Sequence, residues 1–122
     1  MGMSIEEFYR QICGDYAAVS ARLPRAELIE RFIGRFLEDE SFDTLCRHIA
    51  AGNRREAFMA AHTLKGISAN LGFSGLFASV SRLTEKLRPE SDSIPESAAE
   101  MLDDVMRDYK LTAEAIRSYL GK

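Results

Sequence analysis

Apolar side chains recur along this chain at intervals of three and four residues, which is the spacing of one buried face of an α-helix. The pattern is clearest after Pro24, whose fixed φ suits the first turn of a helix. Six apolar positions follow it on one stripe: Leu28, Ile29, Phe32, Ile33, Phe36 and Leu37. We therefore expect a helix from Pro24 to about Asp39.

The same spacing continues to the end of the chain. A short helix is expected from Ser41 to a C-cap at Gly52, and longer ones over 54–72, 73–88 and 96–121. The 73–88 stripe consists of Leu76, Val80, Leu83 and Leu87, and the last stripe of Ala98, Leu102, Val105, Tyr109, Thr112, Ile116 and Tyr119. Four long amphipathic helices with short connections predict an antiparallel four-helix bundle.

Smaller helices are expected ahead of the bundle. Ser4 and Glu7 have the Ser-x-x-Glu spacing of a capping box, which predicts a first helix to about Cys13. Gly14 and Asp15 then interrupt the pattern before a second short helix that ends at Leu23. The sequence thus predicts an all-α fold in a single domain over 1–122, with short helices in 1–23 and the bundle in 24–121.

Composition narrows the class of protein. The chain has 122 residues, of which 46% are hydrophobic and 29% charged, as in ordinary soluble domains. Its net charge of -3 provides no basic excess for nucleic acid or anionic lipid, so neither partner is expected. Cys13 and Cys46 both fall in segments expected to be helical and form no CxxC pair. With no secretory signal and no long apolar run, the expected location is the cytoplasm.

The helix expected over 54–72 carries the candidate chemistry. At about 100° per residue, its core face opposes His62. That core face consists of Ala57, Ala60, Leu64, Ile67 and Leu71. Around His62 on the outward face lie Arg55, Phe58, Met59, Lys65, Gly66 and Ala69. A solvated face would normally carry Glu, Lys and Gln, so this mixture of apolar and small residues favours a docking surface.

Three of these residues suggest a reaction. An exposed imidazole such as that of His62 offers a nitrogen nucleophile near neutral pH without a dedicated base. Gly66 lies one turn later, where glycine is less favourable than alanine in a helix by about 0.5–1 kcal/mol. Clearance for an approaching protein explains that choice, because Gly66 faces outward. Lys65 is placed to bring its ammonium group near an anion attached to the ring.

The segment HTLKGISANLG is similar to the signature H-x-L-K-G-x-S-x-x-L-G of histidine-containing phosphotransfer (Hpt) domains. The matching positions are His62, Leu64, Lys65, Gly66, Ser68, Leu71 and Gly72. The run-up RFIGRFLEDESFDTLCRHIAAGNRREAFMAAH and the downstream RLTEKLR also resemble the family. The resemblance implies that His62 accepts a phosphoryl group, that Lys65 steadies this group and that Gly66 keeps the approach open.

The resemblance also implies partners. The phosphoryl group would be exchanged with an aspartate of a response-regulator receiver domain, or received through a histidine kinase pathway, with Mg²⁺ held by the receiver and no cofactor on this chain. No ATP-binding motif occurs in the sequence, so a phosphocarrier rather than a kinase is expected. We expect a free-standing monomer.

Supporting roles are expected for other positions. Partner binding is expected of Arg55, Phe58, Met59, Ala69 and Arg88, although Arg88 equally fits a solvated surface charge. Structural support is expected of Ser68, Leu64, Leu71 and Gly72. For Ser68 we expect a hydrogen bond to the backbone of a neighbouring helix.

Two other functions are alternatives to phosphotransfer. A bundle of this kind can hold a di-iron site built from Glu-x-x-His pairs, but Met59 and Leu45 stand three residues before the two histidines, so no metal site is expected. An adaptor that binds a receiver domain or a kinase without carrying phosphate is the second alternative. The other histidine, His48, lacks a following Lys-Gly pair and is expected to be an ordinary surface or partly buried residue.

Overall fold

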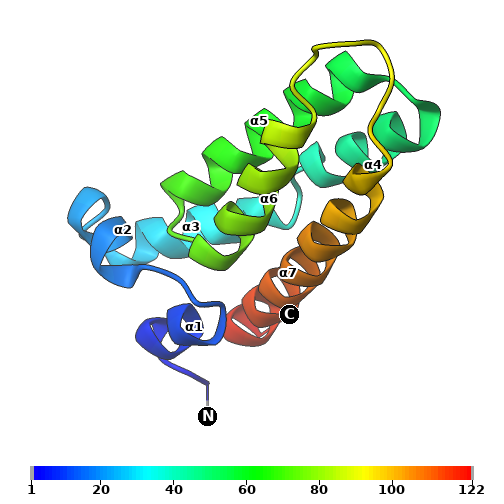
Figure 1. Ribbon diagram of the computed structural model, residues 1–122. Helices are drawn as coiled ribbons and strands as arrows, with labels where there is room; N and C mark the ends of the chain where they lie inside the picture. Colours follow the sequence, from blue (N-terminus) through cyan, green and yellow to red (C-terminus); the bar gives the residue numbers. More distant parts are fainter. Residues whose placement is uncertain (1, 122) are drawn as a thin grey trace.

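The computed structural model describes residues 2–121, and all its regular elements are helices (Figure 1). They are α1 (Ile5–Gln11), α2 (Tyr16–Arg22), α3 (Ala26–Phe36), α4 (Ser41–Ala51), α5 (Arg54–Asn70), α6 (Ser74–Lys86) and α7 (Ser97–Leu120). The predicted all-α class is confirmed. None of these helices is long and apolar enough to cross a membrane.

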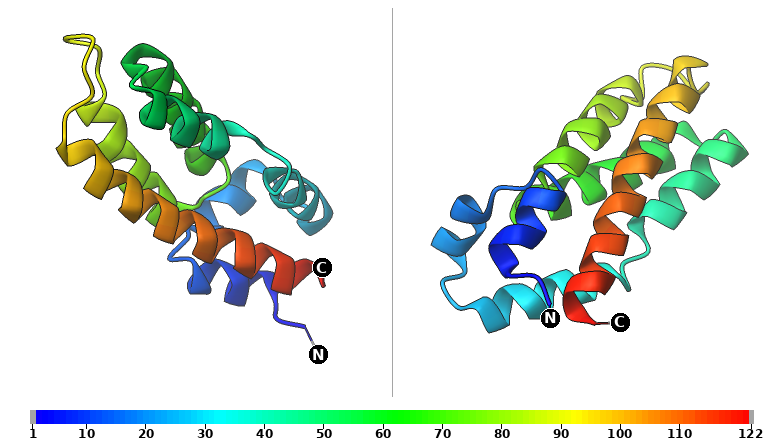
Figure 2. Two further views of the ribbon diagram at one scale, coloured as in Figure 1. Left: turned by 90° about the vertical axis from the view of Figure 1, so that its right-hand side faces the viewer. Right: turned by 90° about the horizontal axis from the view of Figure 1, so that it is seen from below.

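Helices α4 to α7 form the bundle, in which each helix packs against the next along the chain (Figures 1 and 2). Helix α3 adjoins α7, and α1 also packs on α7. The bundle preceded by short helices is as predicted, but its first helix is α4, which was expected only as a short helix, and not the longer helix expected from Pro24. Helix α3 ends at Phe36 rather than near Asp39, and α4 is a full member of the bundle. The Asp39 carboxylate accepts a hydrogen bond from Ser41 N at 2.8 Å, which favours a new helix start over continuation.

The start of α1 follows the capping prediction, whereas its end does not. Ser4 Oγ accepts a hydrogen bond from Glu7 N at 3.1 Å, one of the two bonds of a capping box. The helix ends at Gln11, so the prediction that Cys13 lies in it was wrong. Cys13 has a φ of 52° because Gly14 N turns back to Tyr9 O at 2.7 Å, and this turn leads into α2.

The short N-terminal helices are fastened to the end of α5. Tyr9 Oη donates to Leu71 O at 2.8 Å, and Asp15 N donates to Gly72 O at 2.8 Å. Gly72 has a φ of 71°, and a Cβ atom there would lie 2.8 Å from Asp15 O, so this close crossing requires glycine. These bonds fix α1 and α2 relative to the C-terminal end of α5.

The core contains the predicted stripes. In α6 and the residue that follows it, Leu76, Val80, Leu83 and Leu87 are all buried. In α7, the buried positions are Ala98, Val105, Thr112 and Ile116, and the half-buried ones are Leu102, Tyr109 and Tyr119. Aromatic rings join the N-terminal helices to the bundle: Phe8 and Phe36 each meet Phe73 edge to face, at centroid distances of 6.4 and 5.1 Å.

A buried arginine at the first position of α5 holds the connection between α6 and α7. The Arg54 guanidinium donates to Leu87 O at 3.3 Å and to Lys86 O at 3.2 Å, the free carbonyl groups at the end of α6. It also donates to Ser93 O at 2.6 Å and Ser91 Oγ at 3.1 Å in the loop. The sequence analysis assigned Arg54 no role.

Replacing Arg54 tests whether its hydrogen bonds stabilise the fold. Arg54→Met leaves two helix-end carbonyl groups and a loop carbonyl without their donor, so the free energy of unfolding should fall by about 1–3 kcal/mol. Urea denaturation followed by circular dichroism measures the change. Arg55→Met is the matched control, because Arg55 is the exposed neighbour and should change stability by less than about 0.5 kcal/mol. Equal losses of stability in the two variants would contradict a stabilising role of the Arg54 hydrogen bonds.

The Tyr9 hydrogen bond predicts a dependence of stability on alkaline pH. Burial, with a smaller contribution from Tyr16, raises the pKa of Tyr9 above its ordinary value of 10.0. The folded protein therefore holds this phenol proton more tightly than the unfolded chain, so the stabilisation is complete below about pH 10 and is lost as pH rises further. Tyr9→Phe should lower stability by about 1 kcal/mol at neutral pH. The difference from the unmodified protein should shrink above about pH 10 in urea denaturation, and a constant difference would contradict this account.

Candidate functional site

Helix α5 lies between α4 and α6, and its buried face sets the direction of His62. On the core side Ala57, Ala60, Leu64 and Leu71 are buried, and Ile67 is half-buried. His62 is exposed on the opposite side, as the helical wheel predicts. The imidazole is therefore accessible to another protein while the helix that carries it is held by the core.

Phe58 links His62 to the end of α6. Its ring stacks with the imidazole at a centroid distance of 6.1 Å and an interplanar angle of 24°. The Arg88 guanidinium carbon lies 5.7 Å from the centre of the same Phe58 ring, within range of a cation–π interaction. Arg88 Nε also meets Glu85 Oε2 at 2.8 Å. Arg88 thus has two partners, Phe58 and Glu85, while its side chain stays 57% exposed to solvent.

Lys65 lies on the α6 side of the site. Its side chain is half-buried, and Nζ lies 6.0 Å from the centre of the Phe77 ring. Within residues 2–121, no carboxylate lies within 4.0 Å of this ammonium group. The Lys65 charge is therefore available to an anion brought to the face that His62 occupies.

The surface beside His62 is open. A Cβ atom added at Gly66 would have no heavy atom within 4 Å, so no packing contact inside the described fold requires glycine there. Ala69 is exposed, and Met59 is 58% exposed, an unusual fraction for a large apolar side chain. We refer below to His62, Phe58, Met59, Gly66 and Ala69 together as the His62 face.

Arg55 is exposed at the start of the same side of α5. With Met59 and Thr63 it lines an open groove of about 800 Å³ between α5 and α4. His48 of α4 lines the opposite side of this groove, half-buried, with Nδ1 at 3.1 Å from Asn53 Nδ2. This agrees with the expectation that His48 is partly buried.

The residues expected to support the site are buried, with one correction. Leu64, Leu71 and Gly72 are buried where α5 meets the rest of the fold. The hydrogen bond predicted for Ser68 was wrong: Ser68 Oγ donates to Leu64 O at 2.8 Å, within its own helix. A fully buried serine in a helix finds the carbonyl four residues earlier as its nearest acceptor, so no neighbouring helix is needed.

Three contributors to the site were missed by the sequence analysis. Phe77 meets Lys65 from α6, Arg54 holds the segment that carries Arg88, and Glu85 pairs with Arg88. Only the pairing of Glu85 with Arg88, three residues apart, has a signal in the sequence. The other two contacts join helices and depend on the packed fold. Among residues 2–121, no three His, Cys, Asp or Glu side chains are grouped so that they could hold a metal ion.

Comparison with known proteins agrees with this geometry. The family model for the Hpt domain matches residues 27–118, well over half of the chain, and this match includes the whole of α5. No curated protein and no solved structure matches the chain significantly. Helices α1 and α2 precede the matched region. The chain belongs to the Hpt domain family, whose members have a histidine phosphotransfer role in two-component signalling.

Proposed function

We propose that His62 is the phosphoryl acceptor and donor of this Hpt domain. The observation that carries the proposal is the exposed imidazole on α5 beside Gly66, where an added Cβ atom would meet nothing within 4 Å. Of the two histidines, His48 is half-buried beside Asn53, whereas His62 is exposed in an apolar surrounding. The His62 face thus combines a nucleophile with space for a second protein.

The reaction is an exchange of phosphoryl group between two side chains. A ring nitrogen of His62 uses its lone pair to attack the phosphorus of an aspartyl phosphate on a receiver domain. The new P–N bond forms as the P–O bond to the aspartate breaks, which returns the carboxylate, and the reverse reaction phosphorylates the receiver. In-line attack requires a fixed ring direction, and the stacking of Phe58 on His62 restrains that direction.

Lys65 supplies positive charge for the transferred group. Its ammonium group makes no salt bridge with a carboxylate among residues 2–121, so an incoming phosphoryl group need not displace one. We place the Mg²⁺ of the reaction on the receiver partner, so that this chain contributes the nucleophile and Lys65 while the partner contributes the metal ion and the aspartate.

The same face serves to dock the partner. Phe58, Met59 and Ala69 offer apolar surface around His62, and Arg55 lies at one edge. Arg88 stabilises the position of Phe58 through its ring contact, and its pairing with Glu85 favours this role over direct phosphate binding. A receiver domain, or a kinase domain that donates the phosphoryl group, would cover this face of a monomer. The chain then acts as a phosphocarrier without kinase activity of its own.

His62→Gln tests the acceptor. Glutamine keeps a polar side chain but has no ring nitrogen to attack phosphorus, so transfer of label from a phosphorylated receiver domain should fall below detection. His48→Gln is the matched control and should keep normal transfer. The product on the unmodified protein should lose its label in acid, as phosphohistidine does. An adaptor that binds receivers without carrying phosphate would show no acid-labile product, and retained labelling of His62→Gln would exclude His62 as acceptor.

Substitutions at Gly66 distinguish an effect on stability from an effect on phosphoryl transfer. Gly66→Ala should raise the free energy of unfolding by about 0.5–1 kcal/mol, because alanine favours a helix and its Cβ atom meets no neighbour. Gly66→Gln should also fold, yet its longer side chain would occupy the space beside His62 and slow transfer at least about tenfold. Ala69→Gln introduces the same side chain one turn from Gly66 but farther from His62 along the helix, and should slow transfer less. Full transfer rates for Gly66→Gln would show that this space is not used.

A further inference from the structure

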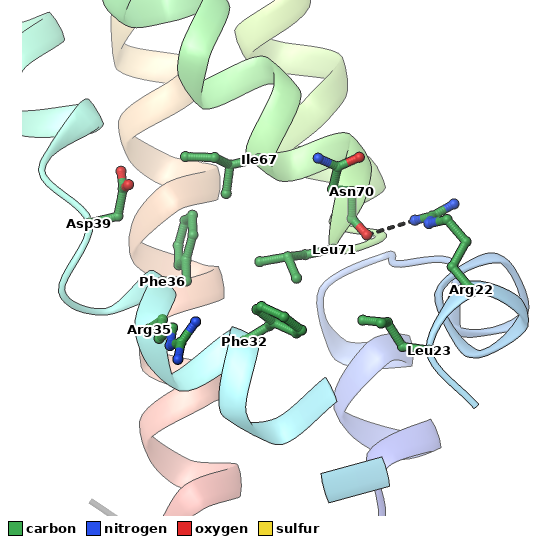
Figure 3. A pocket seen from close by; sticks show the side chains of 9 residues that line it. All are labelled: Arg22, Leu23, Phe32, Arg35, Phe36, Asp39, Ile67, Asn70 and Leu71. Atoms are coloured by element: carbon green, nitrogen blue, oxygen red, sulfur yellow. Dashed lines mark hydrogen bonds between the residues drawn. The ribbon is translucent and has the colours of Figure 1, made fainter. Parts of the chain in front are cut away.

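A cavity of about 420 Å³ lies beside the C-terminal end of α5, and neither His62 nor Phe58 lines it. Figure 3 shows the side chains that do. The walls of the cavity are apolar and come from three parts of the fold: Leu23 after α2, Phe32 and Phe36 of α3, and Ile67 and Leu71 at the end of α5. Phe36 and Leu71 are buried, while the other three side chains are half-buried and lead outward. The cavity therefore has an apolar interior with a mouth on the surface.

Two arginines stand at this mouth. Arg22 Nη2 donates to Asn70 O at 2.6 Å and to Ala69 O at 3.3 Å, which holds the guanidinium in place while its other N–H groups remain available. The Arg35 guanidinium carbon lies 5.6 Å from the centre of the Phe32 ring. Within residues 2–121, neither arginine has a carboxylate within 4.0 Å. The one acidic lining residue, Asp39, accepts a hydrogen bond from Ser41 N.

We propose that this cavity binds a small amphipathic carboxylate, with its apolar part between Phe32, Ile67 and Leu71 and its carboxylate at Arg22 or at Arg35, one on each side of the mouth (Figure 3). Pockets for small ligands commonly have volumes of about 300–1,000 Å³, apolar walls and a few polar groups that fix orientation. Planar guanidinium groups match the geometry of a carboxylate. The lining has two positive charges and one negative charge, in a chain whose net charge is -3, so the cavity favours an anion.

Part of the cavity wall comes from the end of α2 and the residue after it, which precede the region that matches the family. Arg22 and Leu23 lie before residue 27, where the match to the Hpt domain begins. The bonds of Arg22 to the carbonyl groups of Ala69 and Asn70 bring this added segment against the helix that carries His62. The Arg22 side of the mouth therefore lies outside the part of the chain that matches the family, whereas Arg35 lies inside it.

Ligand binding would affect the His62 face. Asn70 lies at the mouth of the cavity, eight residues after His62, and so about 12 Å further along α5. A receiver domain that covers His62 would extend over this distance, since a typical interface buries about 800 Å² on each partner. A ligand at Arg22, which is hydrogen-bonded to Asn70 O, would thus compete with docking. This consequence rests on the proposed function of His62, whereas binding to the cavity does not.

Decanoate is a suitable probe, with decanol and acetate as controls for charge and for the apolar chain. Titration of isotope-labelled protein, followed by amide chemical shifts, should show decanoate binding with a Kd on the order of 1 mM or tighter. The largest shifts should fall on residues 22–23, 32–36 and 67–71. Decanol should bind at least about fivefold more weakly and acetate should cause no saturable shift, because each lacks one half of the recognised group.

Variants at the mouth test the charged contact. At least one of Arg22→Met and Arg35→Met should weaken decanoate binding about 5- to 10-fold, and both should leave decanol binding unchanged. Arg82→Met is the matched control, since Arg82 is exposed on α6 and does not line the cavity. The Arg35 side chain makes no hydrogen bond within residues 2–121, so Arg35→Met is a usable test even if Arg22→Met disturbs α2.

The outcomes separate this site from the phosphoryl site. His62→Gln should bind decanoate as the unmodified protein does, so loss of phosphotransfer and loss of ligand binding are distinguishable. Equal binding of decanol and decanoate, or no effect of either arginine substitution, would overturn the proposal. The absence of decanoate binding would also overturn it, and if Arg22→Met and Arg35→Met then weakened receiver binding, the cavity would belong to the docking surface.

Discussion

The carbonyl groups at the C-terminal end of α5 are the constraint on which the rest of the structure depends. A helix end leaves such groups without partners in the helix, and here Arg22, Tyr9 and Asp15 supply donors to the carbonyl groups of Asn70, Leu71 and Gly72. All three donors come from the segment ahead of the bundle. A requirement of backbone hydrogen bonding therefore attaches α1 and α2 to the helix that carries the proposed phosphoryl site.

At the N-terminal end of α5 the donor lies on α5 itself and the acceptors lie outside it. There Arg54 donates from α5 to the end of α6 and to the loop that follows. Since α5 is fixed at both ends and along its buried face, its outward side needs no further contacts for stability. His62 lies midway, where the helix is rigid but the surface is open, and this is the condition that approach by a second protein demands.

Much of this arrangement follows from periodicity, and the remainder depends on neighbours that only the fold provides. The direction of His62 and the burial of Leu64 were predictable because both follow from 3.6 residues per turn. The partner of Ser68 and the role of Arg54 were not, because each depends on which acceptor is nearest once the helices have packed. The end of α3 at Phe36 was missed because the apolar stripe continues to Leu37, whereas the N–H groups of residues 37–39 bond to carbonyl groups three residues earlier, in turns rather than an α-helix.

The open space around Gly66 has a consequence for how such a protein can change over evolution. In α5, the residues that stabilise the bundle lie on one side of the helix and the residues that would meet a partner lie on the other. Substitutions at Met59 or Ala69 alter the outward surface without removing a buried contact. Partner choice can therefore diverge between copies of such a domain at little expense to folding, while the nucleophile and its supporting core stay the same.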